Sequence, residues 1–129
     1  MKRKLSITLI LLIICAGCRS QLPKQKSTKL PSGKEINVTS IIRMDFPNSE
    51  PGLVMSYLTD ISIDDKVALR KEVDEIWSLF KKDVEDAGLR TGIIRATHME
   101  GTFVKSGKGY GFVFQKRDDG KWHCLEDNK

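Results

Sequence analysis

A long stretch of the chain repeats apolar side chains at helical spacing. Between residues 62 and 88, seven of them fall within a sector of about 100° when successive residues advance by about 100° around an axis, namely Leu69, Val73, Ile76, Trp77, Phe80, Val84 and Ala87. Ser62, with Asp65 three residues later, resembles a capping box, and Gly88 stands where a helix C-terminus favours a left-handed residue. The polar side mixes charges of both signs, so we expect a helix that packs on a core rather than one that lies on a membrane.

Shorter segments on both sides of this helix alternate apolar and polar residues as strands do. Strands are expected over residues 36–44, 53–59, 91–98, 110–116 and 121–125, with a flexible connection over 101–109. The first strand would carry four apolar residues on one face: Ile36, Val38, Ile42 and Met44. The second has apolar residues on both faces, which is typical of a central strand. The resulting order ββαβββ predicts an α+β domain, with a mostly antiparallel sheet packed on one long amphipathic helix.

The loop between the last two strands depends on where their aromatic residues point. Residues 117–121 admit either a two-residue or a three-residue hairpin loop. A three-residue loop with Gly120 left-handed places the aromatic residues of both strands on one face, together with Cys124. The two-residue loop would separate them, so we expect the three-residue loop.

The first 17 residues have the pattern of an export signal. Three basic residues precede a 12-residue apolar run over residues 5–16, and small residues follow it. The run is too short to span a bilayer, which requires about 20 apolar residues in a helix. Residues 1–17 are therefore expected to be a signal peptide.

The end of this run is the most specific motif of the chain. The sequence Cys15-Ala16-Gly17-Cys18 resembles the lipobox of bacterial lipoproteins, with Cys15 where the commonest form has leucine. The resemblance implies diacylglyceryl attachment to Cys18, cleavage just before it, and acylation of the new amino terminus. In Gram-negative members of the family, an aspartate directly after the cysteine favours retention in the inner membrane. This chain has Arg19, so the resemblance implies the outer membrane, facing the periplasm, in a Gram-negative host.

Residues 18–35 have the composition of a disordered tether. They contain two prolines, one glycine, five basic residues and only two large apolar side chains, which cannot offset the entropy lost on ordering. Their positive charges could lie against anionic head groups or belong to a merely solvated spacer. The folded domain is then expected over residues 36–129.

The charge of the whole chain is misleading about partners. Its net charge is +5, which by itself suggests nucleic-acid binding. The excess of basic residues lies near the N-terminus, however, and residues 36–129 contain 14 basic and 16 acidic residues. The predicted domain is therefore mildly acidic, and we expect no nucleic-acid partner.

Few residues could carry chemistry. Cys124 is the one cysteine that a processed lipoprotein would retain outside the lipid, so no internal disulfide can form, and it is expected to be buried as a small hydrophobic residue. A reactive Cys124 would need His98 brought to it through space. His98 and Glu100 share a strand face, but His123 and Cys124 are adjacent and point to opposite faces. We therefore expect no metal site and no cofactor.

Two hypotheses of function remain. The leading one is a lipid-anchored, non-catalytic binding or interaction module of the bacterial cell envelope, whose partner is another envelope protein, an enzyme or toxin that it inhibits, or a copy of itself. The alternative is a small hydrolase or thiol enzyme using Cys124 and His98. The two differ in whether Cys124 is accessible and within hydrogen-bond reach of an imidazole.

Overall fold

The computed structural model describes residues 26–101, 103 and 106–128. The predicted signal peptide, the lipobox with Cys18, and the tether as far as residue 25 lie outside the described residues. Along the chain the elements are β1 (Lys26–Lys29), β2 (Glu35–Met44), β3 (Gly52–Thr59), α2 (Lys66–Asp86), β4 (Thr91–Glu100), β5 (Ser106–Lys116), β6 (Trp122–Cys124) and the short 3-10 helix η1 (Leu125–Asn128).

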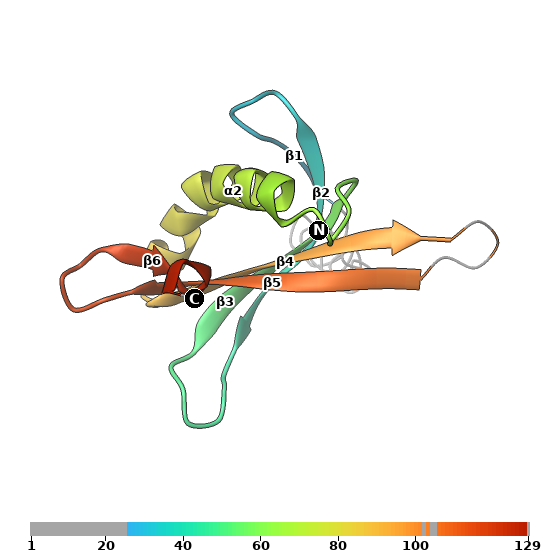
Figure 1. Ribbon diagram of the computed structural model, residues 1–129. Coiled ribbons are helices and arrows are strands. Elements are labelled where there is room, and N and C mark those ends of the chain that lie inside the picture. The colour runs from blue at the N-terminus through green and yellow to red at the C-terminus, as the bar shows by residue number, and fades with distance from the viewer. Residues whose placement is uncertain (1–25, 102, 104–105, 129) are drawn as a thin grey trace, which may run out of the picture.

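The strands form one sheet whose spatial order follows the chain, from β1 at one edge to β6 at the other. Every neighbouring pair is antiparallel except β3 and β4, which run parallel because α2 carries the chain from the end of one to the start of the other. The helix lies across one face of the sheet (Figure 1). The predicted α+β class and the predicted order of one helix among the five expected strands are confirmed, and β3 is central.

The sheet has one strand that the sequence pattern did not predict. Residues 26–29 form β1, which pairs with β2 from Lys26 opposite Val38 to Lys29 opposite Glu35. Leu30, just after β1, is only 3% exposed. The domain boundary expected at residue 36 is therefore wrong, because the fold already includes residues 26–35. Backbone pairing with β2, one buried leucine and polar contacts with α2 hold this segment, and its polar composition predicts none of them.

The amphipathic helix is confirmed, with corrections at both ends. Its N-cap is Asp65, whose carboxylate accepts a hydrogen bond from the Ala68 amide at 3.2 Å, and not Ser62. Ser62 instead accepts a local bond from Asp64 in the turn before the helix. At the other end Gly88 is left-handed, with φ of 71°, as expected. Ala87 is exposed, so the buried apolar positions of α2 end at Val84.

The core lies between α2 and the facing side of the sheet. Trp77 of α2 stacks on Phe114 of β5, with ring centroids 4.3 Å apart and planes 5° apart. Gly92 lies beneath this indole, and a Cβ there would come within 2.7 Å of it. Phe114 pairs with Cys124 across the β5–β6 hairpin, and Gly120 in its loop has φ of 80°. The three-residue loop expected from the sequence is confirmed.

The outer half of β2 departs from simple alternation. A register shift between Val38 and Ser40 marks a bulge, so Val38 lies opposite Tyr57 whereas Ile41 lies opposite Met55. Beyond the bulge each side chain of β2 points to the sheet face opposite to the predicted one, because one extra residue reverses the alternation of side chains between the two faces. Contrary to the expectation of one apolar face, Ile42 and Met44 are exposed.

Beyond the end of β3, the strands β4 and β5 continue as a two-stranded arm (Figure 1). The last β3–β4 pair is Thr59 with His98, while β4 and β5 remain paired as far as Glu100 with Ser106. Residues 106–109, expected to be part of a flexible connection, therefore belong to β5. In the described part of the chain, no helix is long and apolar enough to cross a bilayer.

Candidate functional site

A cleft of about 470 Å³ lies where β3 ends between its two longer neighbours. We call it the β3-end cleft. The start of β2 and the residue before it form one wall, β4 forms the other, and the end of β3 forms the floor. The lining residues are Lys34, Glu35, Ile36, Asn37, Leu58, Thr59, Asp60, His98 and Met99. The cleft lies at the C-terminal end of β3, past the last residue pair that β3 forms with β4, Thr59 with His98.

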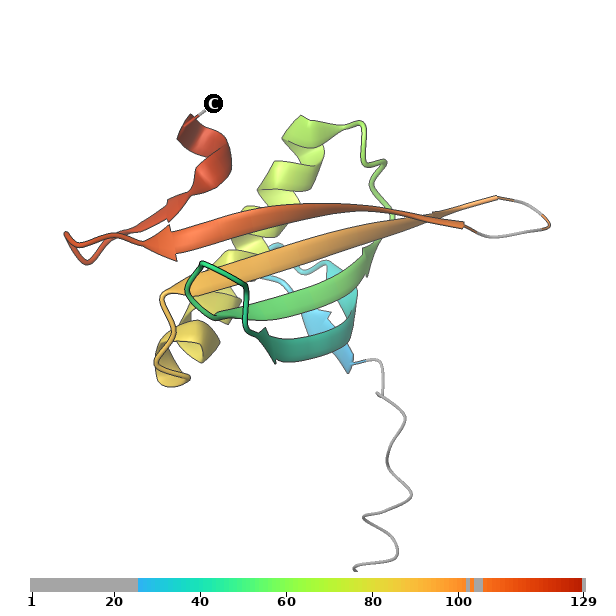
Figure 2. The same cartoon turned by 90° about the horizontal axis from the view of Figure 1, so that it is seen from below.

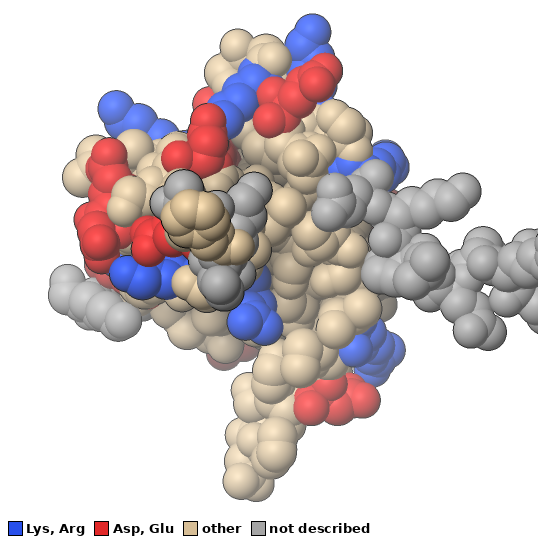
Figure 3. Space-filling model, turned by 90° about the vertical axis from the view of Figure 1, so that its right-hand side faces the viewer, with Lys and Arg blue, Asp and Glu red and all other residues tan. Residues whose placement is uncertain are grey.

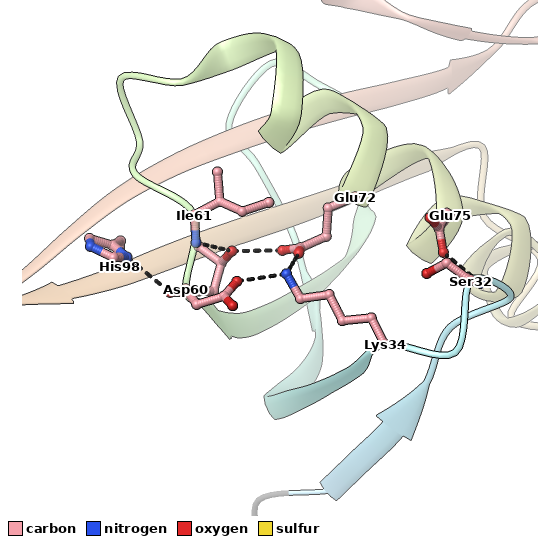
Figure 4. A network of polar contacts seen from close by, with 8 residues as sticks. Ser32, Lys34, Asp60, Ile61, Glu72, Glu75 and His98 are labelled. Carbon is pink, nitrogen blue, oxygen red and sulfur yellow. Dashed lines mark hydrogen bonds and ion pairs between the residues drawn. The ribbon is translucent and has the colours of Figure 1, made fainter.

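A buried carboxylate from the helix lies behind the cleft. The Glu72 side chain is only 3% exposed and forms an ion pair with Lys34. It also accepts a hydrogen bond of 2.7 Å from the Thr59 hydroxyl. The Lys34 ammonium contacts Asp60 as well, with Nζ and Oδ1 2.6 Å apart, so one cation lies between two carboxylates (Figure 4).

The charges of this cluster shift one another's pKa values. Burial alone would lower the pKa of Lys34, but its hydrogen bonds to Asp60 and Glu72 and their negative charges outweigh burial and raise it. The hydrogen bond from Lys34 lowers the pKa of Asp60. Burial, followed by the charge of Glu72, raises the pKa of Tyr57. Among the described residues the fully buried Tyr57 hydroxyl has no well-aligned hydrogen-bond partner, although Glu72 is close enough for its charge to raise the pKa of this hydroxyl.

His98 contributes a defined acceptor to the cleft wall. Its Nδ1 lies 3.1 Å from the backbone oxygen of Thr59. A carbonyl oxygen can only accept, so this contact assigns the proton to Nδ1 and leaves Nε2 of the neutral ring with a free lone pair. His98 is half-buried. It can therefore accept a hydrogen bond from a group bound in the cleft.

The structure does not bring Cys124 and His98 together. Cys124 lies opposite Phe114, which lies opposite Gly92, and His98 is six residues farther along β4. At about 3.3 Å per residue this separates the two side chains by roughly 20 Å along the sheet. Cys124 is 3% exposed, as expected, and burial raises the pKa of its thiol.

The other residues considered for chemistry each lie near a charged side chain. His123 lies opposite Gln115, on the sheet face away from Cys124, and its Nε2 is 3.8 Å from Asp119. Glu100 pairs with Lys108 across the arm at 3.4 Å. Within the described ranges, no three His, Cys, Asp or Glu side chains are grouped to hold a metal ion.

The C-terminal segment is fastened to the start of α2. Arg70 binds Asp127 through two nitrogens, at 2.8 and 3.2 Å. The Tyr110 hydroxyl donates to Glu126 at 2.8 Å, and the Lys66 ammonium lies 3.5 Å from the centre of the Tyr110 ring. These contacts hold η1 over the end of the core that contains Cys124, so we interpret them as structural.

Acidic and basic side chains do not segregate on the face shown in Figure 3. Uncharged residues occupy the centre of that face, and side chains of both signs lie around it. A nucleic-acid surface would instead gather positive charge along one groove or stripe. The charge distribution of this face therefore gives no support to a nucleic-acid partner.

Sequence reasoning missed the pair at the heart of the site, Lys34 and Glu72. Lys34 lies in the segment interpreted as tether. Glu72 lies about 40° outside the apolar sector of the helix, next to Ile76, at about 100° per residue. An acidic residue at the margin of an apolar sector was the available signal. Its basic partner, 38 residues away, could not be identified without the tertiary structure.

Comparison with protein-family models, with curated proteins and with solved structures finds no match to this chain.

Proposed function

We propose that this chain is a lipid-anchored, non-catalytic interaction module of the bacterial cell envelope, held in the outer membrane and facing the periplasm if the host is Gram-negative. The observation that carries the proposal is the sequence Cys15-Ala16-Gly17-Cys18 directly after a basic start and a 12-residue apolar run. Several acyl chains would hold the protein stably, since each buried CH₂ contributes about 0.8 kcal/mol.

The described domain supports a binding role more than a catalytic one. The alternative enzyme needs an accessible Cys124 thiolate beside His98, whereas Cys124 is buried and the strand register separates the two residues. The β3-end cleft has polar groups on its walls and an apolar floor contribution from Leu58. We propose this cleft as the contact surface for an envelope protein or a second copy of the chain.

Lipidation is tested by paired cysteine substitutions. Cys18→Ser should abolish incorporation of labelled palmitate and leave an uncleaved precursor, whereas Cys15→Ser should still be processed and acylated. Intact mass and membrane fractionation of the two variants provide the measurement. Acylation that survives Cys18→Ser, or a wild-type chain without acyl groups, would reject the lipoprotein assignment.

The contact surface is tested by cross-linking in membranes with lipidation intact. Asp60→Asn and His98→Ala alter the cleft, while Asp118→Asn alters a fully exposed carboxylate elsewhere and serves as the matched control. The cleft variants should lose the cross-linked species that the wild-type and Asp118→Asn chains retain. The same cross-links from all four chains would show that the cleft is not the contact surface.

A further inference from the structure

The outer side of β2 is only partly covered. β1 pairs with the first part of β2 and reaches Val38, opposite Lys26, whereas β2 continues to Met44. Residues 40–44, which we call the β2 edge, therefore have no strand on their outer side within the described chain. Among the described residues nothing pairs with their backbone groups on that side, and these groups can meet water, lipid head groups or another strand.

The β2 edge gathers large apolar side chains that remain exposed. Ile41 is 46% exposed, Ile42 50% and Met44 39%. Ile41 lies on the same face as Met55, and Ile42 and Met44 lie on the other face. Exposed apolar side chains thus lie on both faces of the β2 edge. The apolar surface follows this edge of the sheet and does not belong to one face alone.

The described chain begins beside this edge. Lys26 is opposite Val38, next to residues 40–44. Figure 2 shows β1 and β2 on one side of the sheet, with η1 and the C-terminus on the opposite side. Seven residues, 19–25, separate Cys18 from Lys26, and the eight extended steps between these two residues span at most about 28 Å. If Cys18 carries lipid, this tether keeps Lys26, beside the β2 edge, within about 28 Å of the acyl chains.

We propose that the β2 edge contacts the phospholipid surface and forms a second membrane attachment beside the acyl chains on Cys18. This inference rests on the proposed lipid anchor. Ile41, Ile42 and Met44 would enter the boundary between head groups and acyl chains, where water still solvates the free backbone groups of the strand.

Charges around the β2 edge fit a phospholipid surface. Lys26 and Lys29 are exposed on β1. Arg43, on the same face of β2 as Ile41, has 61% of its side chain exposed, and its only ion-pair partner among the described residues is the 84% exposed Asp45, at 3.8 Å. These cations can approach lipid phosphates while the neighbouring apolar side chains meet the acyl region.

The experiment places a photoreactive benzoylphenylalanine at single positions of the full chain and irradiates intact membranes. Ile42 is the test position. Val67, which is 71% exposed at the start of α2, is the control. We expect phospholipid adducts at position 42 to exceed those at position 67 at least fivefold. Met44 offers a second test position if the chain altered at Ile42 does not accumulate.

Two results would overturn the inference: equal phospholipid adducts at positions 42 and 67, or adducts at position 42 mainly with a second copy or another protein. Protein adducts of either kind at position 42 would identify the β2 edge as a strand-pairing surface. The acyl state of Cys18 is read by mass on the same samples. An acylated chain without lipid adducts at 42 rejects this inference alone, while lipid adducts on a chain without acyl groups reject the lipid anchor and retain the contact.

Discussion

Replacing Lys34 by methionine tests whether the hairpin formed by β1 and β2 is held on the helix by the buried ion pair. The change keeps the side-chain volume but leaves Glu72, whose side chain is 3% exposed, with Thr59 as its remaining hydrogen-bond donor among the described residues. Removing one partner of a buried ion pair typically costs about 3–5 kcal/mol. Because 36% of the Lys34 side chain is exposed and water can reach it, we expect a loss of about 2–3 kcal/mol in the free energy of unfolding.

A double-mutant cycle separates this pair from the exposed contact beside it. Urea unfolding, followed by circular dichroism, is measured for Lys34→Met, Glu72→Gln and the double variant. The double variant should be destabilised by less than the sum of the single variants, because removal of both charges leaves no unpaired buried ion.

Asp60→Asn is the matched control for this cycle. This substitution removes the charge of Asp60, the other ion-pair partner of Lys34. Because the Asp60 side chain is 78% exposed, the free energy of unfolding should fall by less than about 1 kcal/mol. A Lys34→Met variant no less stable than Asp60→Asn would refute the reasoning that Glu72 depends on Lys34.

Three further predictions concern pH, the thiol and the helix contact. Hydrogen bonds from Lys34 and Arg70 hold the pKa of Asp60 and of Asp127 below the ordinary 3.8. The ionised carboxylates therefore stabilise the fold above that pH, and this stabilisation is lost as they become protonated below it. Tm should fall as the pH drops below about 3.8, and a Tm that does not change with acid pH would contradict this. Cys124 should resist alkylation in the native state, and Cys124→Ala should cost about 1 kcal/mol through a small cavity, whereas rapid native labelling with unchanged Tm would favour the enzyme alternative. Gly92→Ala places a Cβ 2.7 Å from a carbon of the Trp77 indole and should lower the free energy of unfolding by about 1–3 kcal/mol. Gly111→Ala is the control, because the nearest atom to its Cβ would be 3.8 Å away. Equal effects of the two substitutions on Tm would show that the close approach of Gly92 to the indole does not matter.

The parts of the fold that depend on local pattern were predictable. The helical spacing from Leu69 to Val84 and the left-handed Gly88 defined α2 because one face of an amphipathic helix must be buried. The loop that ends in Gly120 followed from register, since a two-residue loop would have separated the aromatic residues of β5 and β6.

The candidate site was less predictable because its residues meet only through the sheet. His98 was singled out for a thiol that lies elsewhere, and its actual neighbour is the backbone of Thr59 at the end of β3. Asp60 carried no motif at all. A cleft formed where one strand stops short of its neighbours depends on the relative lengths of three strands, which local periodicity does not specify.

By itself the sequence determined the class of fold, the long helix, the order of five strands and the burial of Cys124, because each depends on which face of a local element must avoid water. Only the tertiary structure decided that residues 26–29 join the sheet, that a bulge after Val38 exposes Ile42, and that Lys34 meets Glu72. These features depend on pairing between distant segments. A polar strand can fold when a neighbouring strand satisfies its backbone, and a buried charge is stable when a distant partner reaches it, so neither is encoded in the local alternation of apolar and polar residues.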